Sequence, residues 1–299
     1  MSSQELGGNV LHLSRNKEKK ESDTVDQTAT SDLRELAKRI RQHCVRMTGK
    51  ANASHIGSAL SAADIMAALY GRALRYDPKC PDWPERDRFI MSKGHACTAL
   101  YATLAESGFF PVAALETFYQ NGSPLAGHVM HKDNPGVELS TGSLGHGLPV
   151  ALGMAISAKR DGRASRVFCL LSDGECDEGS VWESALFAPQ HNLDNLIVIV
   201  DYNGIQSLGM VNEVIDLHPL GEKWRAFRWS VREVDGHDMA ALEEALTQTP
   251  YEAGRPSCII ARTIKGKGVS YMENKLLWHY RAPMGEDLTK ALAELGQSK

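Results

Sequence analysis

The sequence lacks several features that would assign it to other classes of protein. Its 33 Lys and Arg against 37 Asp and Glu give a formal net charge of −4, so there is no basic excess for binding a nucleic-acid backbone. Its apolar runs, such as Leu196–Val200, are far below the ~20 residues of a membrane helix. The N-terminus does not have the basic-then-apolar order of a secretory signal. We therefore expect a cytoplasmic protein that binds neither nucleic acid nor membrane.

Cysteine is present, but not in a pattern that carries structure or chemistry. The six cysteines form no Cys-x-x-Cys pair, and Cys and His do not cluster at the short spacings of a zinc site. A chain of 299 residues without a secretory signal does not require a disulfide framework. We expect six free thiols that pack as small apolar side chains.

The chain has enough apolar residues to bury a sizeable core. Hydrophobic residues make up 42% of the sequence, which excludes wholesale disorder. Residues 1–30 are polar, with the charged run Lys17–Glu21 at their centre, and are predicted to form a flexible arm. Order is expected to begin with a helix capped at Thr30–Asp32. Residues 31–299 are predicted to form one domain.

Three apolar runs define the predicted fold. Val167–Leu171, Leu196–Val200 and Ser257–Ala261 are continuous and apolar, which is typical of strands covered on both faces. Helical patterns such as Val181–Gln190 separate them, and the short run Phe89–Met91 leads into another helix. This alternation predicts an α/β domain with a mostly parallel sheet flanked by helices.

Polar residues directly follow two of these strands. Asp173 comes just after the first strand, and Asn203 has the same place after the next, 30 residues on. The carboxyl ends of neighbouring parallel strands meet at one edge of a sheet, where ligands bind. Carboxylate and amide oxygens suit Mg²⁺ shared with a diphosphate. Gly174 would let the backbone approach such a ligand closely.

These residues belong to a longer series of motifs. The series comprises Ser54-His-Ile-Gly57, Asp87-Arg-Phe-Ile-Met-Ser-Lys-Gly-His95, Gly127-His128, Thr141-Gly-Ser-Leu-Gly-His-Gly147, Asp173-Gly174, Glu178-Gly179, Trp182-Glu-Ser-Ala185, Leu193-Asp-Asn-Leu-Ile197, Asp201-Tyr-Asn203 and Trp278-His279. In these motifs and in their order, the chain resembles the transketolase family from about residue 31 to 285. The resemblance implies a thiamine-diphosphate-binding fold of the type that holds the diphosphate (PP type).

The resemblance implies thiamine diphosphate and a divalent metal, Mg²⁺ or Ca²⁺, as cofactors. The metal is expected on Asp173, the side chain of Asn203 and the main-chain oxygen of Ile205. Further contacts are expected from His95, Gly174 and His279 to the diphosphate, and from Gly142 and Leu144 to the thiazolium and aminopyrimidine region.

The resemblance also implies catalytic histidines. His55 and His279 are expected to handle protons at the hydroxyl and carbonyl oxygens of a donor sugar, and His128 to bind a substrate hydroxyl. Histidine suits these roles because small changes of environment move its charge across neutral pH. Ordinary structural or surface roles are expected for His12, His43, His191, His218 and His237.

The family places part of its active site on another polypeptide. A Glu that activates the pyrimidine ring comes from a second domain across the dimer interface, and Glu178 resembles the residue that helps to position it. Because this chain stops at Lys299, we expect the diphosphate-binding subunit of a split transketolase. A separate chain would carry the pyrimidine-binding and C-terminal domains in an α2β2 assembly. The complex would transfer a two-carbon ketol unit from a ketose phosphate, or a related ketose, to an aldose.

Other interpretations stay open at this point. The α subunit of a thiamine-dependent 2-oxo acid dehydrogenase resembles the region around Asp173, and a non-catalytic cofactor-binding remnant is a second alternative. A 1-deoxyxylulose-5-phosphate synthase is also related, but its family normally keeps its domains in one chain. Two positions depart from the transketolase pattern, Ser172 for Gly and His146 for Gln. Lys265–Gly268 lacks the spacing of a Walker loop and is interpreted as a mobile active-site loop.

Overall fold

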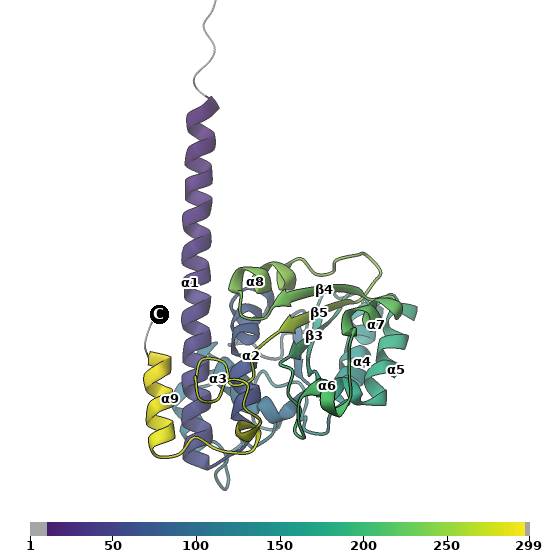
Figure 1. Ribbon diagram of the computed structural model, residues 1–299. Coiled ribbons are helices and arrows are strands. Elements are labelled where there is room, and N and C mark those ends of the chain that lie inside the picture. The colour runs from purple at the N-terminus through teal and green to yellow at the C-terminus, as the bar shows by residue number, and fades with distance from the viewer. Residues whose placement is uncertain (1–10, 297–299) are drawn as a thin grey trace, which may run out of the picture.

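A five-stranded, all-parallel sheet lies at the centre of the computed structural model (Figure 1), which describes the backbone of residues 11–296 and the side chains of residues 30–296. The order of strands across the sheet is β1-β2-β3-β5-β4. The strands are β1 (Arg88–Met91), β2 (Val167–Ser172), β3 (Leu196–Tyr202), β4 (Ser230–Asp235) and β5 (Ser257–Arg262).

Helices cover both faces of this sheet, because successive strand residues point into two different apolar layers. Phe168 and Leu170 of β2 belong to the apolar layer between the sheet and helices α1, α2, α3 and α8 (Figure 1). Cys169 and Leu171 belong to the layer on the other face, between the sheet and α4, α5 and α7. The predicted α/β class is therefore confirmed. The α-helices are α1 (Leu11–Ala51), α2 (Ile56–Ala68), α3 (Cys97–Glu106), α4 (Gly147–Arg160), α5 (Gly179–Gln190), α6 (Val211–Val214), α7 (Leu220–Ala226), α8 (Met239–Thr247) and α9 (Glu286–Gly296).

Short helical turns complete the chain between these elements. A π-helical turn, η1 (Leu69–Ala73), extends α2, and the 3₁₀ turns are η2 (Gly94–Ala96), η3 (Val112–Thr117), η4 (Gly174–Asp177) and η5 (Leu276–His279). Three of them, η2, η4 and η5, carry residues of the predicted site, so the site is built from turns held at the edge of the sheet.

Helix α1 begins earlier than the sequence predicts. Its first residue is Leu11, whereas the predicted cap lies at Thr30–Asp32, inside the helix. The sequence from Leu11 to Thr48 has neither Gly nor Pro, so nothing stops the helix from continuing toward the N-terminus. Figure 1 shows α1 extending beyond the rest of the domain. Residues 1–10 lie outside the described residues, and the flexible arm over residues 1–30 stays a prediction.

The sequence does not predict β4. Ser230–Asp235 lies at the edge of the sheet, where only Ser230 is fully buried and the other residues are partly or well exposed. The strand therefore has the mixed polarity of an edge and not the apolar run by which β2, β3 and β5 are found.

The structure also tests the predictions about membrane helices and cysteines. Between residues 11 and 296, no helix combines the length and the apolar character needed to cross a membrane. All six cysteines are free, and only Cys80 is exposed.

The glycine-rich segment between α3 and α4 packs tightly onto the carboxyl end of β1. Thr141 Oγ1 donates a hydrogen bond to the Met91 carbonyl at 2.6 Å, and the Val129 N–H donates to the Gly94 carbonyl at 3.2 Å. A Cβ atom at Gly94 would lie 2.3 Å from the Thr141 oxygen and 2.7 Å from the Gly142 nitrogen. Only glycine allows this approach, which holds Gly142 beside the end of the sheet.

We predict that Gly94→Ala destabilises the protein by roughly 1–3 kcal/mol, because the added methyl group meets rigid backbone. Gly153→Ala is the matched control. Gly153 is at an exposed position of helix α4, with nothing within 4 Å of its Cβ position, so this substitution should stabilise the protein by up to about 1 kcal/mol. Urea unfolding of both variants measures the difference. Equal stability of the two variants would contradict the close contact at Gly94.

Candidate functional site

A cavity of about 240 Å³ opens at the carboxyl ends of the central strands. Every residue predicted for the site lines it, except Glu178. The lining residues are His55, Ser58, His95, His128, Gly142, Leu144, Ser172, Asp173, Gly174, Asn203, Ile205, Gln206, Ser207, Lys265 and His279. The turn after β1, the glycine-rich segment, the ends of β2 and β3 and two later loops thus contribute to one site.

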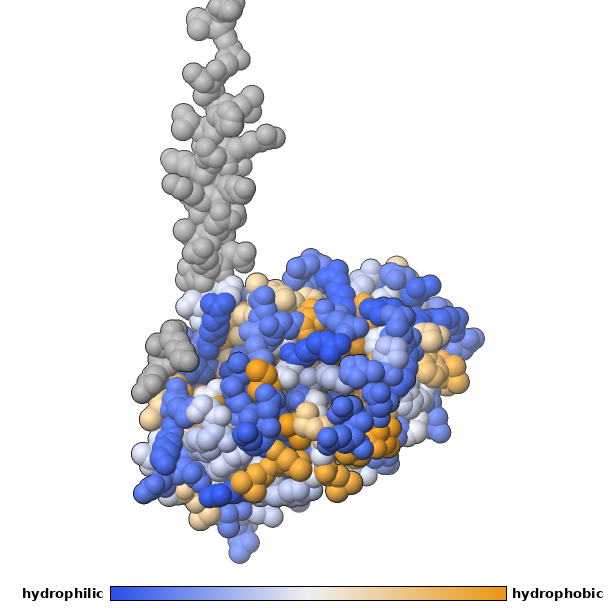
Figure 2. Space-filling view, viewed as in Figure 1, coloured by the Kyte–Doolittle hydropathy of each residue, from blue (hydrophilic) through white to orange (hydrophobic). Residues whose placement is uncertain are grey.

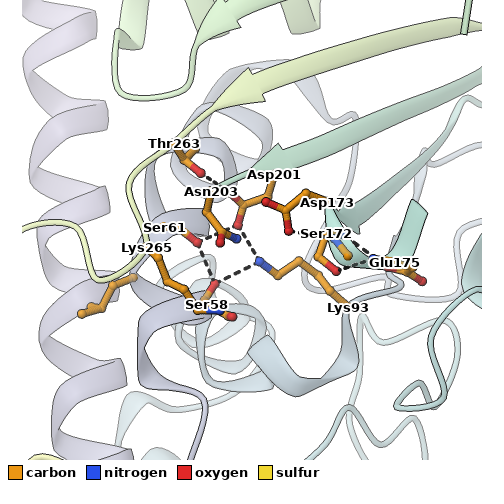
Figure 3. Close-up of polar contacts among 12 residues, drawn as sticks. Ser58, Ser61, Lys93, Ser172, Asp173, Glu175, Asp201, Asn203, Thr263 and Lys265 are labelled. Atoms are coloured by element: carbon orange, nitrogen blue, oxygen red, sulfur yellow. Dashed lines mark hydrogen bonds and ion pairs between the residues drawn. The ribbon is translucent and has the colours of Figure 1, made fainter. Parts of the chain in front are cut away.

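Asp173 connects the ends of β2 and β3. Its Oδ1 accepts a hydrogen bond from the Gly174 N–H at 2.8 Å, and its Oδ2 accepts one from the Gly204 N–H at 2.6 Å. The side chain of Asn203 is directed into the same region, with its Oδ1 accepting from the Ile205 N–H at 3.2 Å. Figure 3 shows Asp173 and Asn203 side by side at the end of the sheet. Both side chains therefore line one cavity at the carboxyl ends of β2 and β3.

The environment of Asp173 disfavours its negative charge. The residue is only 2% exposed, and burial, reinforced by the nearby charge of Asp201, raises the pKa of Asp173 to about 6. A cation bound at its carboxylate would relieve this penalty. The donors available, one carboxylate, one amide oxygen and one main-chain carbonyl, fit a hard cation that takes its other ligands from phosphate and water.

Groups of three or more His, Cys, Asp or Glu that could hold a metal by themselves are absent from the described part of the chain. This agrees with the composition of the predicted metal site, in which only Asp173 belongs to those residue types. A metal ion at this position would need further ligands besides Asp173, namely the neutral oxygens of Asn203 and Ile205 and the oxygens of a bound phosphate group.

A fully buried ion pair lies directly behind these oxygens. Lys93 and Asp201 have 0% exposed side chains, and Lys93 Nζ lies 2.5 Å from Asp201 Oδ2 (Figure 3). Ser61 Oγ also donates to Asp201 Oδ2 at 2.6 Å, and Thr263 donates to the other carboxylate oxygen. Burial alone would raise the pKa of Asp201, but Lys93 and these hydrogen bonds lower it below its usual value. Asp201 is therefore a stable carboxylate, already paired.

Four histidine rings gather on the other side of the cavity. The ring of His55 lies 5.3 Å from that of His95, 5.6 Å from His128 and 5.0 Å from His279, between centroids. The backbone of His55 is left-handed, with φ of 74°, and its N–H donates to the His279 carbonyl at 2.8 Å. His55 and His279, more than 200 positions apart in the chain, are thus in direct contact, and His128 lies beside His55.

Three of these histidines, His55, His95 and His279, are held in their neutral form. Burial lowers the pKa of His55 to about 4, with His128 and Lys265 contributing, and lowers that of His279 to about 3, with Lys265 contributing. Burial and the charge of Lys93 also bring the pKa of His95 well below its ordinary value. Near neutral pH each of these three rings can therefore donate one hydrogen bond and accept another.

Lys265 is a site residue that the sequence motifs do not assign. It is 2% exposed, and its Nζ donates to the Ile205 carbonyl at 2.6 Å and contacts His279 Nδ1 at 2.9 Å. Burial lowers the pKa of Lys265 to about 8, although the charge of Asp173 acts in the opposite direction. The Lys-Gly-Lys-Gly sequence predicts a loop near the site, and only the fold reveals that its first lysine points into the cavity.

Glu175 is a second residue that sequence reasoning misses. It is completely buried; its Oε1 accepts from the Gly145 N–H at 2.9 Å and from Ser92 Oγ, which in turn accepts from the Gly147 N–H at 3.1 Å. Glu175 therefore fastens the glycine-rich segment to the ends of β1 and β2. Glu178, by contrast, is exposed at the start of α5 beside Gly145, outside the cavity.

The comparisons with known proteins point to one family. The family model described as transketolase, thiamine diphosphate binding domain, matches residues 33–298. The 6-deoxy-6-sulfo-D-fructose transketolase subunit SqwG of Clostridium sp. (strain MSTE9) is 42% identical over 88% of this chain and 96% of its own length. An apulose-4-phosphate transketolase subunit of Actinobacillus succinogenes is 43% identical over the same shares.

Solved structures of longer proteins resemble the chain as well. The crystal structure of transketolase from Campylobacter jejuni has a TM-score of 0.83 and 34% sequence identity, and it is matched over 89% of this chain. The chain spans only 43% of that transketolase. The chain therefore spans nearly the full length of the two relatives named as subunits, but less than half the length of the solved transketolase.

Proposed function

Because the chain belongs to the transketolase family and carries its thiamine-diphosphate-binding domain, we propose that it is the diphosphate-binding subunit of a two-chain transketolase. The observation that carries the proposal is the gathering of the motif residues around one cavity, in a chain that covers 96% of two relatives named as transketolase subunits. The reaction is the transfer of a two-carbon ketol unit from a ketose phosphate, or a related ketose, to an aldose.

The cavity's oxygens provide the metal and diphosphate site in this proposal. Asp173, Asn203 Oδ1 and the Ile205 carbonyl hold Mg²⁺ or Ca²⁺. Bound thiamine diphosphate supplies the group that takes up the electron pair when a carbon–carbon bond of the sugar is broken. The other cofactor contacts proposed are His95, Gly174 and His279 at the diphosphate, Gly142 and Leu144 at the rings, and Glu178 toward the partner's activating carboxylate.

Lys265 adds a second positive charge to the proposed metal and diphosphate site. Its charge lies in the same cavity as Asp173, where a diphosphate brings more negative charge than one divalent metal neutralises. Lys265 also determines the tautomer of His279. A charged lysine has only donors, so His279 Nδ1 must accept from it and His279 Nε2 must carry the proton. His279 can then donate that hydrogen to an oxygen in the cavity.

The remaining histidines act on the sugar. Ser54 Oγ lies 2.9 Å from His55 Nδ1. In our assignment Nδ1 carries the ring hydrogen and donates it to Ser54, which leaves His55 Nε2 to accept a proton from the donor's hydroxyl group. His279 Nε2 donates to the donor's carbonyl oxygen. His128 binds a substrate hydroxyl; Tyr101, whose hydroxyl donates to the His128 carbonyl at 2.9 Å, holds its backbone in place. The depressed pKa values of His55 and His279 keep those two rings neutral before the sugar enters.

The partner in this proposal carries the pyrimidine-binding and C-terminal domains, in an α2β2 assembly. Large apolar side chains remain exposed on the two loops that border the cavity, including Leu208 at 79%, Leu277 at 57% and Tyr280 at 59%. Figure 2 shows apolar side chains gathered on the lower part of the face around α6, the short helix that follows the loop of Leu208. Such a patch beside an incomplete site is typical of a surface that another chain covers.

A cytoplasmic location also remains part of the proposal. The alternative functions are weaker, because the relatives described above are named as transketolases or their subunits. A cofactor-binding remnant would have no reason to keep four histidine rings gathered around one cavity.

Ketol transfer by the chain with and without its partner tests the function. We expect a mixture with the pyrimidine-domain chain, thiamine diphosphate and Mg²⁺ to exceed either chain alone by at least ~10²-fold, the contribution of one positioned acid–base group. Spectrophotometric assays with ketose phosphates as donors measure this. Comparable turnover by the chain alone would contradict the two-chain proposal, and activity on pyruvate or branched oxo acids instead would favour the dehydrogenase.

The metal site predicts a specific pH dependence. Because the pKa of Asp173 is raised to about 6, protons compete with the metal below that pH. The affinity for Mg²⁺ in the presence of thiamine diphosphate should fall about tenfold per pH unit below pH 6 and be level above it. Isothermal titration calorimetry measures it, with exposed Asp161→Asn as a control that keeps the profile. Asp173→Asn should weaken binding and remove the dependence; an unchanged profile would exclude Asp173 as a ligand.

A further inference from the structure

His237 makes two contacts that its position in the sequence does not suggest. It follows β4, and its Nδ1 lies 2.7 Å from Asp64 Oδ2 on α2. Its Nε2 accepts a hydrogen bond from the Ile264 N–H at 2.8 Å. The ring is 12% exposed, so it is enclosed between α2 and the loop that follows β5. From the sequence, only an ordinary role is predicted for this residue.

The two contacts determine the protonation of the ring. A backbone N–H can only donate, so His237 Nε2 must be the unprotonated nitrogen. The ring hydrogen is then on Nδ1, which donates it to the carboxylate of Asp64. A ring protonated on both nitrogens, or on Nε2 alone, could not accept from Ile264.

Asp64 is itself held from the other side by helix α1. Arg41 Nη1 donates to Asp64 Oδ1 at 2.9 Å, and Nη2 donates to Asp64 Oδ2 at 2.5 Å. Burial would raise the pKa of Asp64, but Arg41 and His237 together bring it well below its usual value. Asp64 is therefore a carboxylate fixed in a bidentate pair, which gives the His237 ring a rigid acceptor.

The loop that His237 holds carries Lys265. Ile264 directly precedes Lys265, and on either side the Thr263 N–H donates to the Tyr202 carbonyl and the Gly266 N–H to the Gly57 carbonyl, both at 3.0 Å. Between these two backbone anchors, the hydrogen bond from Ile264 to His237 fixes the Thr263–Ile264 peptide group, one residue before Lys265, whose side chain enters the cavity. Lys265 Nζ then reaches Ile205 and His279.

From these contacts we infer that His237, held by Asp64 and Arg41, is a positioning residue that places Lys265 in the diphosphate pocket. The chain of contacts runs from α1 through α2 and the turn after β4 to the loop after β5, without touching the cavity itself. The inference rests on the proposed function, because it assumes that Lys265 serves the bound diphosphate.

A pair of substitutions separates the two contacts of the ring. His237→Gln keeps an oxygen near the position of Nε2 and so an acceptor for Ile264, whereas His237→Asn keeps only a group near Nδ1. In the holoenzyme with its partner chain and Mg²⁺, we expect His237→Asn to raise the dissociation constant of thiamine diphosphate about tenfold, the value of one hydrogen bond, and His237→Gln to raise it no more than about threefold. Calorimetry with thiamine diphosphate measures both.

A double-mutant cycle tests whether His237 acts through Lys265. In a Lys265→Met background, His237→Asn should have no further effect on the dissociation constant, because the side chain that it positions is gone. Additive effects of the two substitutions would overturn the inference, as would equal effects of His237→Asn and His237→Gln. The control is His43→Asn, which removes a similar contact to a carboxylate, Glu106, away from the loop and should leave the dissociation constant unchanged.

A measurement on the unaltered chain covers the case in which a variant does not fold. Nitrogen-15 NMR of the His237 ring reports its tautomer, and the inference predicts a proton on Nδ1 and none on Nε2. A proton on Nε2 would overturn it. If the wild-type holoenzyme does not bind thiamine diphosphate, the proposed function fails, whatever the tautomer; if it binds and His237→Asn binds equally well, only the positioning role fails.

Discussion

The hydrogen bonds that Asp173 accepts from Gly174 and Gly204 are the interaction on which the site depends. A parallel sheet delivers the ends of β2 and β3 to the same edge, and Asp173 ties the two turns together there. Asn203 and Ile205 follow on the second turn, so three oxygens of different kinds share one small volume. The fold thus provides the proposed cation site with only one acidic side chain, that of Asp173.

The buried charged residues around Asp173 differ in whether they have a partner inside the protein. Asp201 is paired with Lys93, and Glu175 is hydrogen-bonded to the glycine-rich segment, so both have internal partners. Asp173 and Lys265 instead face the cavity, the first with a raised pKa and the second with a lowered one. A buried charge without a full partner is costly to folding. A bound metal would place a positive charge beside Asp173, and a bound diphosphate would place negative charge beside Lys265. Relief of both unpaired charges would favour binding of the cofactor in this cavity.

Much of this could be predicted from the sequence, for identifiable reasons. Buried parallel strands are continuous apolar runs, and residues such as Asp173 and Asn203 that directly follow them must share an edge. Edge strand β4 has no such signal, and neither does the early start of α1 at Leu11. Lys265 and His237 could not be assigned, because their roles come from contacts with Ile205, Asp64 and Ile264 that no local pattern records.

The most direct measurement of the central claim is a crystal structure of the holoenzyme with thiamine diphosphate and Mn²⁺ in place of Mg²⁺, using anomalous scattering to locate the metal. The account predicts one peak in each cavity, bonded to Asp173, the Asn203 side chain and the Ile205 carbonyl at about 2.0–2.3 Å. A peak on other residues, or a bound diphosphate without a metal between these oxygens, would contradict it.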